Sequence, residues 1–399
     1  MNSRVSVLIL GGRLTANLVG ILALQPDAVE FVVSEDTPAR YAEICEVLGQ
    51  FVEIKHLGEP CTLTAYDFAA TRDACLTIAH GHPGAEVIFD VTSAPKVMGF
   101  AAYEAARSLN QRLVIVDTSN GQVLDLIPPD ATPVSIDITL EQYLACYGRR
   151  AVFTFDFDKL SIDRQAALQL ADYLARAGIP AVEGLNGMRS WSQGSGKRTI
   201  PFQKTKPLSP EALVVLGALE SFGIISDLQK QADGRVQYTI MNDMDWAYLQ
   251  GTWLEAYVWN QALSMRHKNG QPLLQDACLG FSFEIPSEGA RKEIDVGYVY
   301  HGQFIHASCK TEANPFKTRY LDEIRAVSSL VGGRFTSRLF ITNAYPRDGD
   351  PEYDRFLAQA EDRQAHDGEH QQRPRVLERE QRRGERQDRP GEALAERHQ

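Results

Sequence analysis

The chain has 399 residues, of which 44% are hydrophobic and 23% charged, and this length predicts two or three domains. No run approaches the roughly 18 apolar residues that span a bilayer, and no signal peptide is recognisable, so we expect a cytoplasmic protein without a membrane partner. A net charge of −11 excludes a generally basic surface, and six cysteines without a CxxC pair exclude a zinc ribbon or a disulfide framework.

The N-terminal part alternates short β-branched runs with helical patterns. The runs are residues 5–10, 30–34, 86–91 and 112–117, and the helical patterns are residues 15–24, 41–48, 65–80 and 95–109. This alternation predicts a doubly wound α/β sheet, in which ligands bind beyond the carboxyl ends of the strands.

Two of these strand ends carry small, polar loops that open helices, Gly11-Gly12-Arg13-Leu14-Thr15 and Thr92-Ser93-Ala94-Pro95-Lys96. Small residues let backbone N–H groups approach an anion, and the following helix N-terminus favours phosphate. Lys96 adds a full positive charge. Glycines and Pro95 that only make tight turns would give the same pattern. The candidate ligand-binding residues are Gly11, Gly12, Arg13, Thr15, Thr92, Ser93 and Lys96.

Residues 149–243 form a less regular middle segment. Its basic stretch, Gly194-Ser195-Gly196-Lys197-Arg198, lacks the first glycine and the final Ser or Thr of a phosphate-binding P-loop. A helix that begins at Ser209-Pro210-Glu211 and ends near Gly223 precedes strands at 224–228 and 236–240. A helix followed by a hairpin predicts a small winged-helix-like element, which we interpret as a connector because it has no dense basic recognition helix.

Residues 244–360 are predicted to form a second α/β unit. A long helical pattern covers 245–268, strands follow at 274–285, 293–300 and 304–310, and a helix at 320–330 precedes a strand at 338–343. Along the strand 304–310, Ile305, Ala307 and Cys309 point to an apolar face, whereas His306, Ser308 and Lys310 point to the other. Residues 361–399 are almost all charged or polar and are expected to form a disordered tail.

Asp295 lies across the hairpin from Lys310, and Glu255 lies on the preceding helix. Two carboxylates and a lysine could form a site for Mg²⁺ or Mn²⁺, an ion that polarises a scissile phosphate and lowers the pKa of an attacking water. Lys310 would orient that water or stabilise the developing charge. A solvated strand face with an ordinary Asp–Lys pair would show the same residues.

The order of these motifs resembles that of the CRISPR-associated CARF–nuclease proteins. The resemblance covers most of residues 1–345 and rests on Asp90-Val91-Thr92-Ser93-Ala94-Pro95-Lys96, Gly251-Thr252-Trp253-Leu254-Glu255, Glu293-Ile294-Asp295-Val296 and Cys309-Lys310-Thr311 followed by Gly332-Gly333. It implies a Rossmann-like CARF domain in residues 1–148, which binds a cyclic oligoadenylate, above all cyclic tetra-adenylate, across a homodimer interface. It also implies a C-terminal PD-(D/E)xK restriction-endonuclease-like domain that cleaves RNA or DNA when the ligand is bound.

The resemblance places the family's helix acid on Glu255, its strand aspartate on Asp295, its lysine on Lys310, and the acid two residues before the lysine on Ser308. A hydroxyl is a weaker metal ligand than a carboxylate, so the metal set Glu255, Asp295 and Ser308 predicts weakened cleavage. Glu312 or Glu293 could substitute for the missing acid. Two other functions stay open: a sensor that binds the ligand without cleavage, and a nucleotide-dependent transcription regulator.

Overall fold

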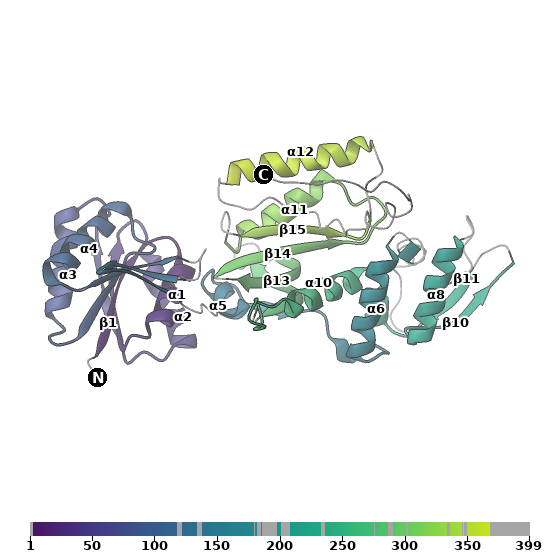
Figure 1. The fold of residues 1–399 in the computed structure, drawn as a ribbon, viewed down its shortest axis with the longest axis horizontal. Coiled ribbons are helices and arrows are strands. Elements are labelled where there is room, and N and C mark those ends of the chain that lie inside the picture. The colour runs from purple at the N-terminus through teal and green to yellow at the C-terminus, as the bar shows by residue number, and fades with distance from the viewer. Residues whose placement is uncertain are drawn as a thin grey trace, which may run out of the picture.

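The fold has three parts in a row: an N-terminal domain, a central sheet and a helix-and-hairpin unit (Figure 1). The structure is a computed structural model that describes residues 3–117, 122–133, 138–178, 180–181, 185, 198–200, 208–232, 236–274, 276–285, 290–300, 302–332, 336–344, 346 and 349–367. The stretch 194–197 and residues 368–399 of the predicted tail lie outside these described residues.

The N-terminal domain is built on a largely parallel sheet. In the described part of the chain its strand order is β3-β2-β1-β4-β5-β6-β7, and β6 runs antiparallel to the others. The strands are β1 (Arg4–Leu10), β2 (Ala28–Ser34), β3 (His56–Leu63), β4 (Glu86–Asp90), β5 (Arg112–Asp117), β6 (Gln122–Ile127) and β7 (Pro129–Pro133). The order from β3 to β5 is that of a Rossmann-like fold, so the predicted doubly wound sheet is confirmed.

Helices cover both faces of this sheet. They are α1 (Leu14–Leu24), α2 (Ala39–Phe51), α3 (Phe68–His80) and α4 (Lys96–Leu109). Val7 and Ile9 of β1 lie in the buried cluster formed with α3 and α4, whereas Leu8 and Leu10 lie in the cluster formed with α1 and α2. Because successive side chains of a strand alternate between faces, an uninterrupted apolar run serves both cores.

The helix-and-hairpin unit follows the predicted winged-helix-like pattern. It contains α6 (Arg164–Ala177), α8 (Pro210–Phe222) and a sheet in the order β10-β11-β9, made of β10 (Ile225–Lys230), β11 (Val236–Ile240) and β9 (Arg198–Ile200). The Ser209 hydroxyl accepts a hydrogen bond from the Ala212 N–H at the start of α8, and Gly223 ends that helix at φ 84°. The predicted helix and hairpin are therefore present.

A mixed sheet in the order β15-β14-β13-β12-β8 forms the centre of the C-terminal part. Its strands are β8 (Ala151–Phe153), β12 (Ala277–Ile285), β13 (Ala290–Tyr300), β14 (Gln303–Lys310) and β15 (Ser337–Thr342). The helices of this part are η1 (Phe157–Lys159), α9 (Asp243–Ala247), η2 (Tyr248–Thr252), α10 (Trp253–Ser264), α11 (Thr318–Ser329) and α12 (Pro351–Asp367). Strand β8 belongs to this sheet, although its residues fall within the segment expected to be the connector.

The long helical pattern at 245–268 is divided in the structure. A π-helical turn, η2, separates α9 from α10, and Gly251 within it has a non-helical backbone. At the other end of the sheet, α12 continues to Asp367, past residue 361 where the tail was expected to begin. No helix among the described residues is long and apolar enough to cross a membrane.

A short helix, α5 (Leu140–Ala145), joins the N-terminal domain to the central sheet (Figure 1). Thr139 and Gln142 form a capping box at its start. Its Tyr143 ring stacks on Phe304 of β14, with ring centroids 5.4 Å apart. Tyr143 and Phe304 share a buried cluster with Val19 of α1, so the two parts of the molecule are in apolar contact through α5.

Candidate functional site

A cleft opens at the carboxyl edge of the N-terminal sheet, where the strand order reverses at β1. Its volume is about 460 Å³. It is lined by Gly11, Gly12, Ser34, Asp36, Thr37, Ala65, Tyr66, Ser93, Ala94, Pro95, Lys96 and Val97. Ligands of doubly wound sheets bind at this topological position, so the cleft is the candidate binding site of the domain.

The two predicted phosphate loops meet in this cleft, and glycine is required where they touch. The Gly11 N–H donates a hydrogen bond to the Ser93 hydroxyl at 3.1 Å, and a Cβ on Gly11 would lie 1.6 Å from the Ser93 carbonyl oxygen. A Cβ on Gly12 would meet nothing within 4 Å. Backbone groups at Gly12 are therefore accessible to an anion, while Gly11 permits the close approach.

The structure separates the seven predicted ligand residues into two groups. Gly11, Gly12, Ser93 and Lys96 line the cleft, whereas Arg13, Thr15 and Thr92 are not among its lining residues. Thr15 is buried within α1, and the Thr92 hydroxyl donates to Asp90 and accepts from the Val116 N–H. Thr92 therefore fixes the loop, and the binding role of all seven residues stays a prediction.

Asp90 anchors that loop from the end of β4. Its side chain is fully buried, and this burial raises the pKa of its carboxyl to about 6. The Thr92 N–H donates to Asp90 Oδ1 at 2.9 Å. The carboxyl also lies against α1, because a Cβ on Gly20 would be 2.3 Å from Asp90 Oδ2. Sequence spacing gave no sign of this packing role.

A second cluster of polar groups lies on β13 and β14 of the central sheet. Asp295 Oδ2 accepts hydrogen bonds from the Cys309 N–H at 2.7 Å and from the Ser308 hydroxyl at 3.2 Å, and Lys310 Nζ lies 3.4 Å away. The side chains of Asp295 and Lys310 are 19% and 24% exposed. All three donors contact Oδ2 of Asp295, and no donor among the described residues contacts its Oδ1.

Glu255 approaches this cluster beside Gly280 of β12. Gly280 of β12 has φ 53°, and a Cβ there would lie 3.3 Å from Phe155 Cβ and 3.8 Å from Glu255 Oε2. The neighbours of Asp295 along β13, Val296 and Ile294, belong to different buried clusters. Asp295 therefore lies between residues of two different buried clusters.

The Glu255 carboxyl is placed in an unfavourable electrostatic environment. Burial, followed by the charges of Asp295 and Glu293, holds its pKa well above the ordinary value, and Lys310 opposes this only partly. None of the described residues makes a hydrogen bond to the Glu255 side chain. A buried carboxylate without a donor, next to a second carboxylate, is the kind of donor set that a divalent cation satisfies.

The end of β14 is tied to the π-helical turn that precedes Glu255. The Thr311 hydroxyl donates to the Gln250 carbonyl oxygen at 3.0 Å and lies 3.5 Å from the position of a Cβ on Gly251. This contact satisfies a backbone acceptor that the irregular turn exposes. It also fixes α10, which carries Glu255, relative to the strand that carries Lys310.

The face of β14 that carries His306, Ser308 and Lys310 is more covered by other side chains than the sequence indicated. His306 and Ser308 are 3% and 5% exposed, and His306 Nδ1 lies 3.0 Å from the Ser328 hydroxyl of α11. Desolvation lowers the pKa of His306 to about 4, so it is neutral near pH 7. Glu312, one expected substitute for the missing acid, is paired instead with Lys317 at 2.6 Å.

The donor set of the cluster fits a divalent cation only in part. Glu255 and Asp295 Oδ1 are two available carboxylate ligands, and Ser308 stands where a third carboxylate was expected. In the described part of the chain, no three His, Cys, Asp or Glu side chains form a group that could hold a metal ion. The residues therefore fit a weakly held ion that relies on two carboxylates.

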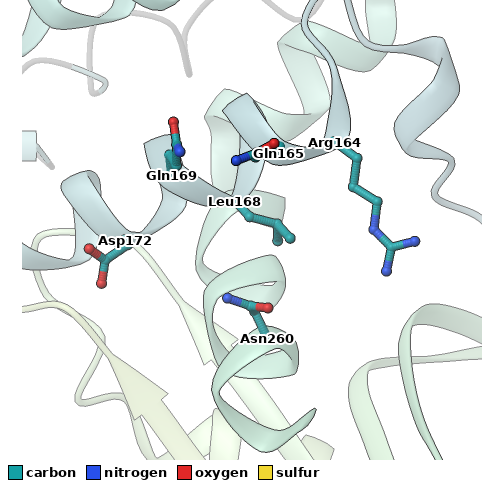
Figure 2. A pocket seen from close by; sticks show the side chains of 6 residues that line it. All are labelled: Arg164, Gln165, Leu168, Gln169, Asp172 and Asn260. Atoms are coloured by element: carbon teal, nitrogen blue, oxygen red, sulfur yellow. The ribbon is translucent and has the colours of Figure 1, made fainter. Parts of the chain in front are cut away.

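A polar groove between α6 and α10 was not anticipated from the sequence (Figure 2). It measures about 600 Å³ and is lined by Arg164, Gln165, Leu168, Gln169, Asp172 and Asn260. Asp172 is paired with Arg176 at 2.6 Å, and the other polar groups are mainly amides. The groove offers no base–nucleophile pair, so we assign it no chemistry.

No protein-family model matches the sequence, and no curated protein sequence matches it. Several solved structures, however, are similar to this chain. Protein VC1899 from Vibrio cholerae is similar with a TM-score of 0.71 and 19% identity over 90% of this chain and 92% of that one. Can2 from Sulfobacillus thermosulfidooxidans, in complex with cyclic tetra-adenylate, has a TM-score of 0.66 and 18% identity over 89% of this chain and 93% of that one.

A third similar structure is that of a type III CRISPR defence DNA nuclease activated by cyclic oligoadenylate. Its TM-score is 0.50 at 15% identity, and this chain spans 47% of its length. Identities this low establish the fold and leave the chemistry open. The chain therefore has the arrangement of domains that the resemblance implied, a Rossmann-like N-terminal domain followed by a second α/β domain built on a mixed sheet.

Proposed function

We propose that this chain is a cyclic-oligoadenylate-activated, metal-dependent nuclease of type III CRISPR antiviral defence. One observation carries the proposal: Glu255, Asp295 and Lys310 gather on the central sheet of a fold that Can2 shares. In the sequence these residues are separated by up to 55 positions, and only the fold brings them together. Two carboxylates beside a lysine suit phosphodiester hydrolysis.

The N-terminal cleft is the proposed ligand site, and cyclic tetra-adenylate is the proposed activator. Gly12 and Ser93 offer backbone and hydroxyl groups to a phosphate, and Lys96 offers a charge. A cyclic ligand with repeated phosphates can be bound by the same loops of two protomers, so we expect a C2 homodimer with the ligand on its axis. Light scattering of the ligand-bound protein measures this directly.

The C-terminal cluster is the proposed catalytic site, with RNA or DNA as substrate. Glu255 and Asp295, with Ser308 as a weaker third group, would hold Mn²⁺ or Mg²⁺, which supplies Lewis acidity and an acidified water. Lys310 then donates hydrogen bonds to the attacking water or to a phosphate oxygen. Asp295 keeps Lys310 in place through Oδ2, which leaves Oδ1 for the cation.

Ligand binding would control cleavage by favouring one arrangement of the two parts. Such a shift requires that the ligand binds the active arrangement more tightly than the inactive one. Helix α5 is placed to transmit the difference, because Tyr143 packs on Phe304 of β14 and shares a cluster with Val19 of α1. Phe304 belongs to the same strand as Lys310.

The test is to incubate the purified protein with Mn²⁺ and labelled RNA or DNA, with and without cyclic tetra-adenylate. Cleavage that requires the ligand supports the proposal. Cleavage that ignores the ligand contradicts the gating, and the matching Lys310→Ala variant identifies contaminating nucleases.

Ser308 favours a second candidate function, a sensor that binds the same ligand and signals without cleavage. Its hydroxyl already donates to Asp295, and the described residues offer no third carboxylate at this position. Ligand binding with no cleavage of RNA or DNA in Mn²⁺ would favour this candidate. A protected DNA footprint under the same conditions would point to the winged-helix-like element and a regulator of transcription.

A further inference from the structure

We propose that the N-terminal cleft also recognises the ribonucleoside part of its ligand, through Asp36 and Tyr66. Asp36 accepts a hydrogen bond from a ribose 2′-hydroxyl, and the Tyr66 ring stacks on a base. The inference rests on the proposed function and deepens it, because it names which chemical groups of a cyclic oligoadenylate the cleft distinguishes.

The order of the strands sets the order of the groups along the cleft. Lys96 and Ser93 follow β4, Gly11 and Gly12 follow β1, Asp36 follows β2, and Tyr66 follows β3. These four strands are neighbours in the order β3-β2-β1-β4, with about 5 Å between adjacent strands. The phosphate-binding groups therefore lie at one end of the cleft, and Asp36 and Tyr66 lie at the other.

The negative charge of Asp36 is unexpected in a cleft that is proposed to bind an anion. Of the described residues that line the cleft, Asp36 is the one carboxylate and Lys96 the one cation. A carboxylate repels a phosphate, so a ligand that contained phosphate alone would bind better without it. A carboxylate accepts hydrogen bonds from hydroxyl groups, and in doubly wound folds an acidic residue beyond the second strand binds a ribose hydroxyl.

The turn after β2 holds the Asp36 side chain towards the cleft. The Asp36 N–H donates to the Ser34 hydroxyl at 3.2 Å, and that hydroxyl lies 3.5 Å from Asp36 Oδ2. The Thr64 hydroxyl donates to Glu35 Oε1 at 2.8 Å and ties this turn to the end of β3. Among the described residues no donor contacts Asp36 Oδ1, which leaves that oxygen for a ligand hydroxyl.

Tyr66 supplies a flat apolar surface on the other side of that turn. It is 81% exposed, and its ring makes no contact with another aromatic ring of the described chain. Ala65 before it is buried and Asp67 after it caps α3, so the backbone on both sides is fixed. Every base has a π-face, and stacking on an exposed aromatic ring is a common way to bind single-stranded nucleotides.

The experiment measures the affinity of the full chain for cyclic tetra-adenylate and for its all-2′-deoxy analogue by calorimetry. The wild-type protein should prefer the ribose ligand by about tenfold to a hundredfold, as expected for one hydrogen bond to a charged group. Asp36→Ala should bind both ligands equally, because only the ribose form loses a contact. Asp73→Ala, which removes a carboxylate on α3 outside the lining residues, should keep the wild-type preference.

Tyr66 is tested with the ribose ligand. Tyr66→Ala should weaken binding by about tenfold, and Tyr66→Phe should bind as the wild type does, because stacking needs the ring and not the hydroxyl. Phe153→Ala removes an aromatic side chain that is 61% exposed on β8 and should change nothing.

The outcomes separate this inference from the proposed function. A wild-type protein that binds neither ligand overturns the proposed function and this inference with it. Tight binding of both ligands with equal affinity overturns the role of Asp36 alone, since the cleft would then bind phosphate without reading the sugar. Unchanged affinity of Tyr66→Ala overturns the stacking role.

Discussion

The two candidate sites of this chain are built in opposite ways. The N-terminal cleft is open, lies at a strand edge, and is lined largely by backbone and small side chains around Gly11 and Ser93. The C-terminal cluster is enclosed and charged, and it depends on the side chains of Glu255, Asp295 and Lys310. The first site is suited to binding an anion, whereas the second stores unfavourable charge that a cation would neutralise.

This difference means that the two sites should respond to mutation independently. A single variant in either site should alter either ligand affinity or cleavage chemistry, because no described residue belongs to both sites. Variants that change both properties would contradict the division.

Replacement of Lys310 should have the largest effect. Lys310→Ala removes the group that stabilises charge at the scissile phosphate, so cleavage should fall by at least about a hundredfold. Affinity for cyclic tetra-adenylate, measured by calorimetry, should stay the same. Lys268→Ala, at an exposed position beyond α10, is the matched control. Undiminished cleavage by Lys310→Ala would remove this residue from the catalytic site.

Replacement of Lys96 should act on the other site. Lys96→Ala removes a charge-assisted contact to phosphate, so ligand affinity should fall by about tenfold to a hundredfold. Lys55→Ala, whose amine is paired with Asp27 outside the cleft, serves as the control. An unchanged dissociation constant in a folded Lys96→Ala protein would place the ligand elsewhere.

An acid at position 308 should improve the catalytic site. Ser308→Glu adds the third carboxylate next to Asp295 and should raise ligand-dependent cleavage by about tenfold, with a smaller advantage of Mn²⁺ over Mg²⁺ than in the wild type. Ser308→Gln has nearly the same size without the charge and should not raise the rate. Equal rates for Glu and Gln would show that the missing carboxylate does not limit cleavage.

The smallest effect expected is on stability, through Glu255. Its folded-state pKa is raised, so the unfolded chain ionises first and stability falls as the pH rises through the folded pKa. Glu255→Gln should therefore be more stable than the wild type in alkaline buffer and no more stable in acid, as thermal unfolding would reveal. Mn²⁺ should stabilise only the wild type, and equal stabilisation of both proteins would contradict the metal assignment.

Sequence patterns predicted most of the N-terminal sheet and missed its edges. The apolar, β-branched runs of β1, β2, β4 and β5 are buried on both faces, which makes them easy to recognise. Strand β3 contains Gly58 and Pro60, is partly exposed and gives no alternating pattern. Helix α5 is short, but the capping box at Thr139 and Gln142 was a readable signal.

Site residues were likewise predictable where they follow regular, buried strands and were missed elsewhere. Gly11, Gly12, Ser93 and Lys96 could be placed because the loops after predicted strands were examined, and the same rule applied to β2 would have found Asp36. Tyr66 follows the strand that was missed. In the C-terminal part, motif order located the residues of the cluster, but the position of Glu255 beside Gly280 depends on tertiary packing, which leaves no periodic pattern in the sequence.

The most direct test of the central claim is the rate of cleavage measured against the concentration of cyclic tetra-adenylate, in Mn²⁺, for the wild type and Lys96→Ala. If occupancy of the cleft controls the nuclease site, Lys96→Ala should need more ligand by the same factor as its loss of affinity and should reach the same maximal rate. A curve that does not shift, or cleavage without ligand, would contradict the account.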